Sequence, residues 1–324
     1  MLLQQRTLRT IEHYWAVRLE MTSAIYLSSV VKRYGKLIAV NGLTLQIEEG
    51  EVFALLGPNG AGKTTTIEMI EGLRRPDQGT IRVAGLDPMR DSGQLSQVIG
   101  VQLDSTPLYP LLTVQETFSH FGRYYRRHRS ANEMIELMSL QDKAGSRVKF
   151  LSQGQRQRLA LGLALINNPR IVFLDEPTAG LDPQGRQHIW EIITRERANR
   201  TVLLTTHYMQ EAETICDRVG IIDHGELIAL GAPAALVAEH NLVSRIELIL
   251  PPGIAVTQFA GIPRVIKVSE QSGRLIIDTD DSFFVLSQIM DLLRHHQRSL
   301  EYLSVRPGNL EDVFLKLTGR HLRP

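Results

Sequence analysis

The sequence predicts an α/β fold for about the first 240 residues and a smaller α+β domain after them. Short apolar strands alternate with helical segments, which is typical of a sheet covered by helices. A glycine-rich loop joins one of these strands to a helix. Near residue 240 the order of the elements changes. We therefore expect an extension at 1–22, a main domain at 23–240 with a helical subdomain at about 105–168, and an accessory domain at 241–324.

The main domain is expected to contain strands that are short and apolar, as parallel strands are when helices cover both faces of the sheet. The expected strands are 24–31, 43–47, 51–56, 171–174, 201–205 and 219–222. The expected helices are 63–73, 113–129, 153–166, 183–198 and 208–215.

The accessory domain is expected to contain strands at 244–250, 265–269, 274–279 and 300–305, with helices at 283–296 and 310–318. If 255–260 is also helical, the order is β-α-β-β-α-β followed by a last helix, which is a ferredoxin-like pattern. Pro251, Pro252 and Gly253 leave little room for that first helix.

The composition is that of an ordinary globular protein, with 43% hydrophobic and 22% charged residues. The net charge of +1 gives no argument for a nucleic-acid partner. A single cysteine, Cys216, cannot form an internal disulfide, which fits a reduced compartment. The longest apolar run, 159–166, is too short to cross a bilayer. Charged residues interrupt 1–20, so we expect no signal peptide; Leu8, Ile11, Trp15 and Leu19 form one stripe of a short helix.

The loop after the strand at 51–56 fits the phosphate-binding pattern G-x-x-x-x-G-K-[ST]. Glycines let the backbone turn so that its N–H groups point at phosphate oxygens, and the following helix adds its positive dipole end. Lys63 supplies a charge between the β- and γ-phosphates, and the Thr64 hydroxyl is a ligand type that suits Mg²⁺. The expected nucleotide-binding residues here are Gly57, Pro58, Asn59, Gly60, Ala61, Gly62, Lys63, Thr64 and Thr65.

Two carboxylates and a histidine follow later strands of the same predicted sheet. Asp175 ends the strand 171–174 and is placed to orient Mg²⁺. Glu176 points the other way along the pleat and is placed to orient or deprotonate an attacking water. His207 follows the strand 201–205. Because ligand sites in open α/β sheets gather at the carboxyl ends of strands, we expect these residues to meet the phosphate loop, with Glu176, His207 and Lys63 as the catalytic group.

Together with these motifs, the segment Leu151-Ser-Gln-Gly-Gln155 resembles the signature loop of the ATP-binding subunits of ABC transporters. Ala179-Gly-Leu-Asp182 resembles the D-loop of that family, His207 its switch histidine, and Tyr34 the aromatic residue that stacks on adenine. The motifs occur in the order of the family over residues 23–240. From the residues alone, Ser152 is a natural N-cap for a helix that begins near Gln153.

The resemblance implies an ATPase that uses ATP and Mg²⁺. It implies that Ser152, Gly154 and Gln155 close on ATP held by another subunit, in a head-to-tail homodimer or heterodimer, with Asp182 at the dimer contact. It also implies separate transmembrane permease subunits that dock on about 105–150, a peripheral position at the cytoplasmic face of the cell membrane, and no nucleic-acid partner.

The sequence departs from the family pattern at two places. Gln153 replaces the usual first glycine of the signature pair. Gly154, the second glycine, still allows the backbone to approach the phosphate closely. The family usually has a glutamine four residues before a motif like Leu108-Tyr-Pro110, where this chain has Asp104. Gln102 lies two residues earlier and keeps the same face of a strand. Either Asp104 takes the Mg²⁺-facing role or Gln102 does.

The segment 306–320 resembles the tail of ATPases that serve ABC-2 type exporters, such as the daunorubicin-resistance group, and implies export as the direction of transport. Two other functions compete with this one. One is a soluble ABC ATPase that acts on nucleic acid or ribosomes, and the other is a nucleotide sensor whose second domain binds a small molecule. Co-purification with a membrane protein, with ribosomes or with neither separates the three.

Overall fold

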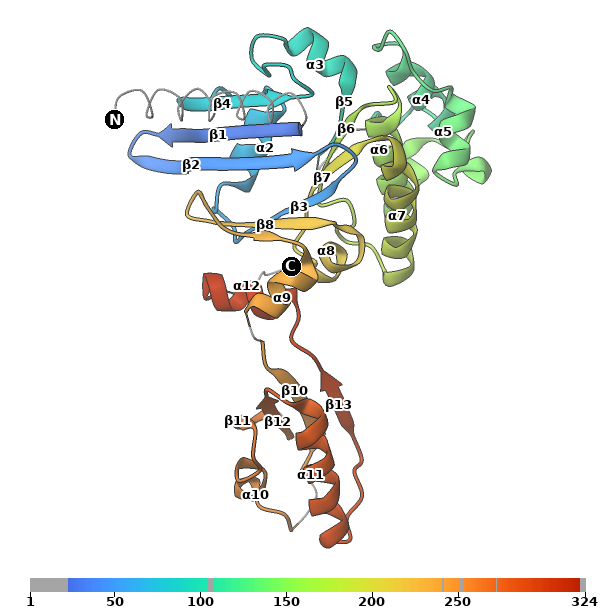
Figure 1. Cartoon of the computed structure of the whole chain (residues 1–324). Helices are drawn as coiled ribbons and strands as arrows, with labels where there is room; N and C mark the ends of the chain where they lie inside the picture. Colours follow the sequence, from blue (N-terminus) through green and yellow to red (C-terminus); the bar gives the residue numbers. More distant parts are fainter. Residues whose placement is uncertain (1–22, 104–107, 241, 251–252, 272, 321–324) are drawn as a thin grey trace, which may run out of the picture. The chain divides into compact units, whose positions relative to one another are not determined.

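The computed structural model describes residues 23–103, 108–240, 242–250, 253–271 and 273–320 (Figure 1). The chain forms two compact units: the first ends at Pro233 and the second is Ala234–Arg320. The predicted N-terminal helix with Leu8, Ile11, Trp15 and Leu19, and also Asp104, lie outside the described residues. Within the described part of the chain, no helix has both the length and the apolar content needed to span a membrane.

The first unit contains a six-stranded sheet in the order β5-β6-β7-β3-β8-β9. Its strands are β3 (Val52–Leu56), β5 (Ile99–Gln102), β6 (Ile171–Asp175), β7 (Thr201–Thr205), β8 (Arg218–Asp223) and β9 (Glu226–Gly231). All pairs are parallel except β8 with β9. Every residue of β3 and of β7 is buried, as expected for parallel strands that are covered on both faces. The carboxyl ends of β3, β6 and β7 therefore meet at one edge.

A three-stranded antiparallel sheet in the order β2-β1-β4 accompanies it. These strands are β1 (Ser23–Tyr34), β2 (Leu37–Glu48) and β4 (Gln78–Val83). β1 is longer than the predicted strand 24–31 because it pairs with β2 along its whole length. Apolar side chains from both sheets and from α2 (Lys63–Ile70) form one core, which includes Ile25, Leu27, Ile47, Phe53, Ile67, Ile70, Phe173 and Leu203.

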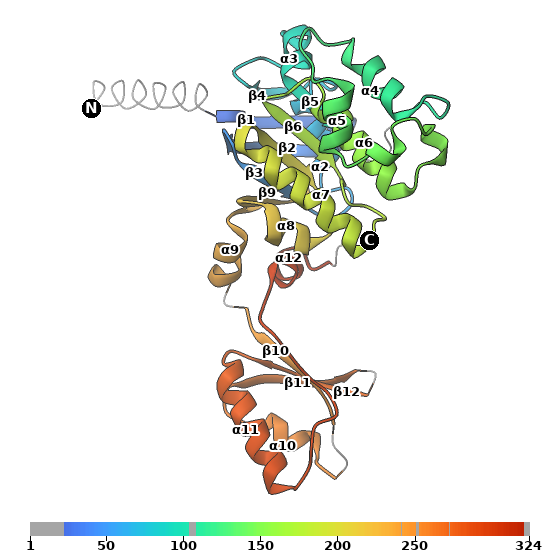
Figure 2. The same ribbon diagram turned by 90° about the vertical axis from the view of Figure 1, so that its right-hand side faces the viewer.

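The remaining helices of the first unit are α3 (Ser92–Val98), α4 (Val114–Gly122), α5 (Ala131–Leu137), α6 (Gln153–Leu165), α7 (Pro183–Glu196) and α8 (Met209–Ile215), with 3-10 turns at Gln141–Lys143, Val148–Phe150 and Arg197–Asn199. Helices α4 and α5 lie beside α6 (Figure 2). The prediction of a helix over 113–129 was wrong beyond Gly122. There the backbone N–H of Arg126 bonds to Gln97 and that of Arg129 bonds to Ile166, so contacts with neighbouring segments replace helical bonds.

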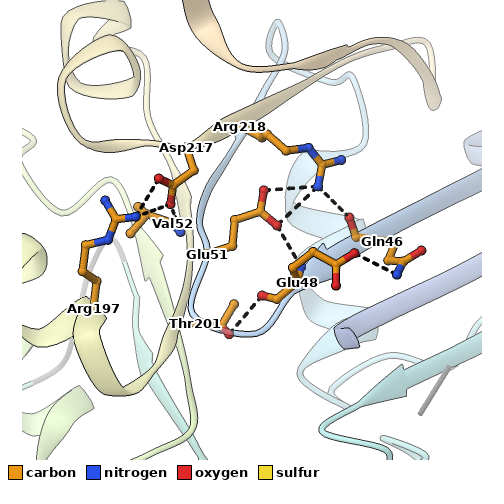
Figure 3. Close-up of polar contacts among 8 residues, drawn as sticks. All are labelled: Gln46, Glu48, Glu51, Val52, Arg197, Thr201, Asp217 and Arg218. Atoms are coloured by element: carbon orange, nitrogen blue, oxygen red, sulfur yellow. Dashed lines mark hydrogen bonds and ion pairs between the residues drawn. The ribbon is translucent and has the colours of Figure 1, made fainter. Parts of the chain in front are cut away.

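A network of polar contacts fixes the starts of β3 and β8, as Figure 3 shows. Glu51, which is 5% exposed, accepts bonds from the Arg218 guanidinium at 3.2 and 3.3 Å and from the Glu48 N–H at 2.8 Å. Asp217 accepts from the Val52 N–H at 2.8 Å and pairs with the Arg197 guanidinium at 2.6 Å. Burial raises the pKa of Glu51, whereas the Glu48 N–H and Arg218 oppose that shift. The network thus stabilises the sheet at the strand ends opposite the phosphate loop.

The second unit contains an antiparallel sheet in the order β11-β12-β10-β13. Its elements are α9 (Pro233–Glu239), β10 (Ser244–Ile249), α10 (Val256–Ala260), β11 (Val265–Gln271), β12 (Arg274–Thr279), α11 (Ser282–His295), β13 (Leu303–Arg306) and α12 (Leu310–Thr318). Helices α10 and α11 lie on one face of the sheet (Figure 2). Their apolar side chains, such as Phe259 and Ile289, belong to one core with those of the strands. The order β-α-β-β-α-β is the one predicted, with a first helix of only five residues.

A substitution at Gly100 of β5 tests how closely the sheet and α6 are packed. A Cβ at this position would lie 1.7 Å from the Ala164 carbonyl oxygen, so Gly100→Ala must push β5 away from α6. We expect it to lower the free energy of unfolding by about 1–3 kcal/mol, measured by urea denaturation. Gly93→Ala is the control, because a Cβ there meets nothing within 4 Å and an alanine favours the helix α3. Equal stability of the two variants would contradict the packing argument.

Candidate functional site

The loop after β3 requires glycine at two positions. A Cβ on Gly57 would lie 2.4 Å from the Ile222 carbonyl oxygen of β8. Gly62 has a φ of +102°, and a Cβ there would lie 2.3 Å from the Ala39 carbonyl oxygen of β2. Side chains at either position would force the loop away from the strands that support it. The glycines therefore let the loop backbone pass between β2 and β8 into the start of α2.

The Lys63 ammonium lies inside the curve of this loop. Its Nζ donates to the carbonyl oxygens of Gly57 at 2.5 Å and Pro58 at 3.1 Å. Burial lowers the pKa of Lys63, and the carboxylates of Glu176 and Asp175 oppose that shift. Lys63 is also the first residue of α2, so unpaired N–H groups of the first helical turn lie beside its charge. This arrangement suits a bound anion.

A cavity of about 400 Å³ opens at the loop. Its lining residues come from the β1–β2 hairpin, the phosphate loop, the start of α2 and the ends of β6 and β7. They are Tyr34, Leu37, Ala39, Asn59, Gly60, Gly62, Lys63, Thr64, Thr65, Asp175, Glu176 and Thr205. The structure thus brings the predicted aromatic residue, lysine and both carboxylates to one cavity.

Tyr34 is held at the rim of this cavity by charged neighbours. The residue is 40% exposed, and the guanidinium carbon of Arg74 lies 5.3 Å from the ring centroid. Arg74 is itself paired with Glu68 at 2.6 Å. Asp77 accepts from Lys32 Nζ at 3.0 Å and from the Arg33 N–H at 2.7 Å. The hairpin that carries Tyr34 is therefore tied to the segment that follows α2.

Asp175, Glu176 and His207 form a connected polar group at the ends of β6 and β7. The Thr205 hydroxyl donates to Asp175 Oδ1 at 2.5 Å. Glu176 has a left-handed backbone with a φ of 52°, and its carboxylate pairs with Nδ1 of His207. Burial raises the pKa of Glu176, whereas His207 opposes the shift. A partly desolvated carboxylate beside a histidine is suited to accept a proton.

The signature segment is a capped helix start, as predicted. Ser152 Oγ accepts from the Gln155 N–H at 3.3 Å, and Gln155 Oε1 accepts from the Ser152 N–H at 2.9 Å. Gln153 Nε2 donates to the Ala179 carbonyl oxygen at 3.4 Å. The glutamine that replaces a glycine in the family pattern thus contacts the segment that leads to Asp182.

Asp182 caps α7, since its Oδ1 accepts from the Gly185 N–H at 2.9 Å. Of the described residues that line the 400 Å³ cavity, none is Ser152, Gly154, Gln155 or Asp182. Within one chain, the signature segment and the phosphate loop are therefore separate features.

Gln102 is buried in the sheet rather than exposed in the cavity. It is 1% exposed, and neither Oε1 nor Nε2 has a hydrogen-bond partner in the described structure. Its backbone pairs with Leu174 in the parallel register. The alternative residue, Asp104, lies outside the described residues, so the choice between the two stays open.

Two residues of the site were missed by the sequence analysis. Thr205 could have been predicted from the sequence, because it stands at the end of the strand that leads to His207. The sequence indicates Glu71 more weakly, because it only follows the largely buried stretch Thr66–Ile70 at the end of α2. Burial, together with the charges of Asp175 and Glu68, raises the pKa of Glu71 to about 8. A neutral acid thus lies near Asp175 at neutral pH.

Comparisons with known proteins identify relatives of both units. The family model described as "ABC transporter" matches residues 40–179, and the one described as "Nodulation factor export protein NodI, C-terminal domain" matches residues 268–319. Nod factor export ATP-binding protein I of Paraburkholderia xenovorans is 39% identical over 308 residues, 93% of this chain and 99% of that protein. Linearmycin resistance ATP-binding protein LnrL of Bacillus subtilis is 37% identical over 307 residues, 91% of this chain and 98% of that protein.

Solved structures of ATP-binding cassettes resemble about two thirds of the chain. A dimeric post-hydrolysis state of the cassette MJ0796 with ADP and Pi has a TM-score of 0.58 at 28% identity and covers 64% of this chain and 98% of that one. CbiO1 from Clostridium perfringens, part of the ABC transporter complex cbiONQ, has a TM-score of 0.61 at 26% identity and covers 68% and 92%.

The raised pKa of Glu71 predicts how the stability of the protein changes with pH. Between about pH 5 and 8 the unfolded carboxyl ionises while the folded one stays protonated, so burying Glu71 costs the protein more stability as pH rises. In Glu71→Gln this cost is absent. We expect the free energy of unfolding of the variant, minus that of the parent, to grow from pH 5 to pH 8, measured by urea denaturation at each pH. A difference that is constant with pH would show that Glu71 titrates normally.

Proposed function

The chain belongs to the family of ABC transporter ATP-binding subunits, and from this premise we propose that it powers the export of a substrate through a separate ABC-2 type membrane permease. The relatives named for Nod factor export and linearmycin resistance, matched over almost their whole length, support export as the direction. We further propose that it works peripherally, at the cytoplasmic face of the cell membrane, without a nucleic-acid partner.

The observation that carries the proposal is the convergence of Lys63, Asp175 and Glu176 on one cavity, with His207 paired to Glu176. A phosphate loop alone is common to many nucleotide-binding proteins. Its combination with a carboxylate–histidine pair and a separately capped signature helix is what an ATPase of this family needs.

In the proposed mechanism, Tyr34 stacks on adenine, and the backbone N–H groups of the loop 57–65 bind the phosphates. Lys63 places its charge between the β- and γ-phosphates. Glu176 accepts a proton from, or orients, the attacking water, and His207, which pairs with Glu176, helps to position and polarise that water. No covalent intermediate is needed, because positioning and charge stabilisation provide the rate of phosphoryl transfer.

The donors at the cavity fit Mg²⁺, which prefers oxygen ligands and is usually bound by one or two protein groups together with substrate phosphates. The Thr64 hydroxyl and the Asp175 carboxylate, both at the cavity, would hold it. When bound, the ion would neutralise phosphate charge. The Thr205 hydroxyl fixes the orientation of Asp175 for this role. We propose in the same way that either Gln102 or Asp104 faces the Mg²⁺ ion.

We propose that two chains, or this chain and a related one, close head to tail around two ATP molecules. Ser152, Gly154 and Gln155 would then face the γ-phosphate bound by the partner, and Asp182 would lie at the contact. The capped start of α6 supports this, because a helix start with oriented N–H groups attracts an anion.

Glu176→Gln should bind ATP but lose nearly all hydrolysis, because the amide cannot accept a proton, and it should accumulate as an ATP-bound dimer. Lys63→Ala should instead weaken ATP binding itself. Hydrolysis rates, equilibrium binding and size-exclusion chromatography with ATP measure these outcomes. Glu270→Gln and Lys267→Ala, at exposed positions of the second unit, are the matched controls. Hydrolysis by Glu176→Gln at the parent rate would contradict the role of Glu176.

The exporter proposal predicts that the protein binds a membrane protein. Purification from detergent-solubilised membranes should recover a protein with about six membrane spans in stoichiometric amount. Recovery of ribosomes would favour the nucleic-acid alternative. Recovery of neither, when a membrane protein encoded by an adjacent gene is co-expressed, would contradict the transporter assignment.

A further inference from the structure

The backbone bends between the end of β7 and the start of α8. The N–H of Tyr208 donates to Oγ1 of Thr206 at 2.9 Å, which is the turn that a threonine side chain forms with the backbone two residues on. Along an extended strand, neighbouring side chains point to opposite faces. At this bend they lie together: the ring centroids of His207 and Tyr208 are 4.1 Å apart, with an angle of 40° between the ring planes. The Tyr208 ring therefore packs against the His207 imidazole.

Helix capping does not explain a tyrosine at position 208. Tyr208 is the residue immediately before α8, where Ser, Thr, Asp and Asn are preferred because their side chains accept bonds from the first helical N–H groups. The Tyr208 side chain makes no such capping bond. The reason for a large aromatic side chain at this position therefore lies in its contacts with other residues.

A cation on α7 lies over the same ring. The Arg186 guanidinium carbon is 4.7 Å from the centroid of the Tyr208 ring, within the distance at which a cation is attracted to an aromatic face. In the described part of the chain, Nε of Arg186 is buried and has no hydrogen-bond partner. Burying such a group costs free energy. The contact with the Tyr208 ring offsets part of that cost.

Helix α7 is itself fixed to α8 near this cation. One turn after Arg186, the Trp190 indole Nε1–H donates to Oε1 of Glu211 on α8 at 2.8 Å. Residues four apart on a helix share one face, so the face of α7 that carries Arg186 is the face that is bonded to α8. Arg186 thus projects from a helix whose place beside α8 is already set, and it contacts the ring that packs against His207.

The orientation of His207 matters because its Nδ1 pairs with the Glu176 carboxylate. One such pairing does not fix the plane of an imidazole ring, which can still rotate about its side-chain bonds. A second ring packed against the imidazole restricts that rotation. Tyr208 and Arg186 are not among the described residues that line the 400 Å³ cavity, so neither side chain is placed to contact the phosphates.

We propose that Tyr208 is a positioning residue for the Glu176–His207 pair: its ring, held by the Arg186 cation, fixes the plane of the His207 imidazole that faces Glu176. This inference rests on the proposed function and deepens it. Tyr208 acts through His207 and does not itself contact ATP or the attacking water.

The test compares Tyr208→Leu, which removes the ring, with Tyr208→Phe, which keeps it. Tyr208→Leu should lower kcat for ATP hydrolysis by about 10- to 100-fold and change KM for ATP by less than about 3-fold, because small misplacement of reacting groups is costly. Tyr208→Phe should stay within about 2-fold of the parent kcat, because both contacts are made by the ring. Tyr302→Leu is the matched control and should equal the parent: in the second unit, the Arg274 guanidinium carbon lies 4.3 Å from the Tyr302 ring centroid.

Arg186→Gln tests the cation that holds the ring. The ring stays in place but is less firmly held, so we expect kcat to fall by about 3- to 10-fold with KM for ATP little changed. Arg274→Gln, which removes the cation beside Tyr302, is the control and should match the parent.

The His207→Ala background separates positioning from a general defect. With no imidazole left to hold, Tyr208→Leu should slow single-turnover ATP hydrolysis by less than about 3-fold, because the effects of residues that act as a unit are not additive. A further loss as large as the one in the parent background would overturn the inference.

Thermal unfolding identifies any variant that fails to fold; if Tyr208→Leu does so, Arg186→Gln replaces it in the test. A folded Tyr208→Leu with the parent kcat, or a Tyr208→Phe as slow as Tyr208→Leu, would also overturn the inference. The proposed function is judged separately by the parent and Glu176→Gln. If the parent hydrolyses ATP and Glu176→Gln does not, that function stands whatever the Tyr208 variants do. A parent without ATPase activity would overturn both.

Discussion

The hydrogen bonds of the Lys63 ammonium to the carbonyl oxygens of Gly57 and Pro58 are the interaction on which the site depends. They keep the loop curved around a positive charge, and the close packing of Gly57 and Gly62 on β8 and β2 keeps that curve in place. The polar network around Glu51 stabilises the opposite ends of the strands. The phosphate loop and the two carboxylates at the end of β6 therefore lie at the same edge of a rigid sheet.

Features encoded within a few residues could be predicted from the sequence. The phosphate loop and the capped start of α6 depend on local spacing and on side chains that bond to nearby backbone. The convergence of Asp175 and Glu176 on the loop followed from the rule that parallel strands end at one edge. The helix over 113–129 was predicted too long because its end depends on tertiary contacts of Arg126 and Arg129.

What the sequence could not predict depends on residues that are distant in the chain. The contact of Gln153 with Ala179 gives a physical reason for the departure from the family pattern, since a glycine could not reach that carbonyl group. Gln102 looked like a substitute for Asp104 from its spacing, yet its side chain is buried and finds no hydrogen-bond partner among the described residues. Glu71 lies in no motif, and only its burial marks it.

The buried acid Glu71 has an electrostatic consequence for the site. Burial and neighbouring charges raise its pKa to about 8, so at neutral pH it is largely uncharged near Asp175. Ionised, it would add negative charge near a cavity that is proposed to bind a polyanion, and repulsion in a partly desolvated site is strong. The neutral form of Glu71 can therefore supply packing near the site without weakening phosphate binding.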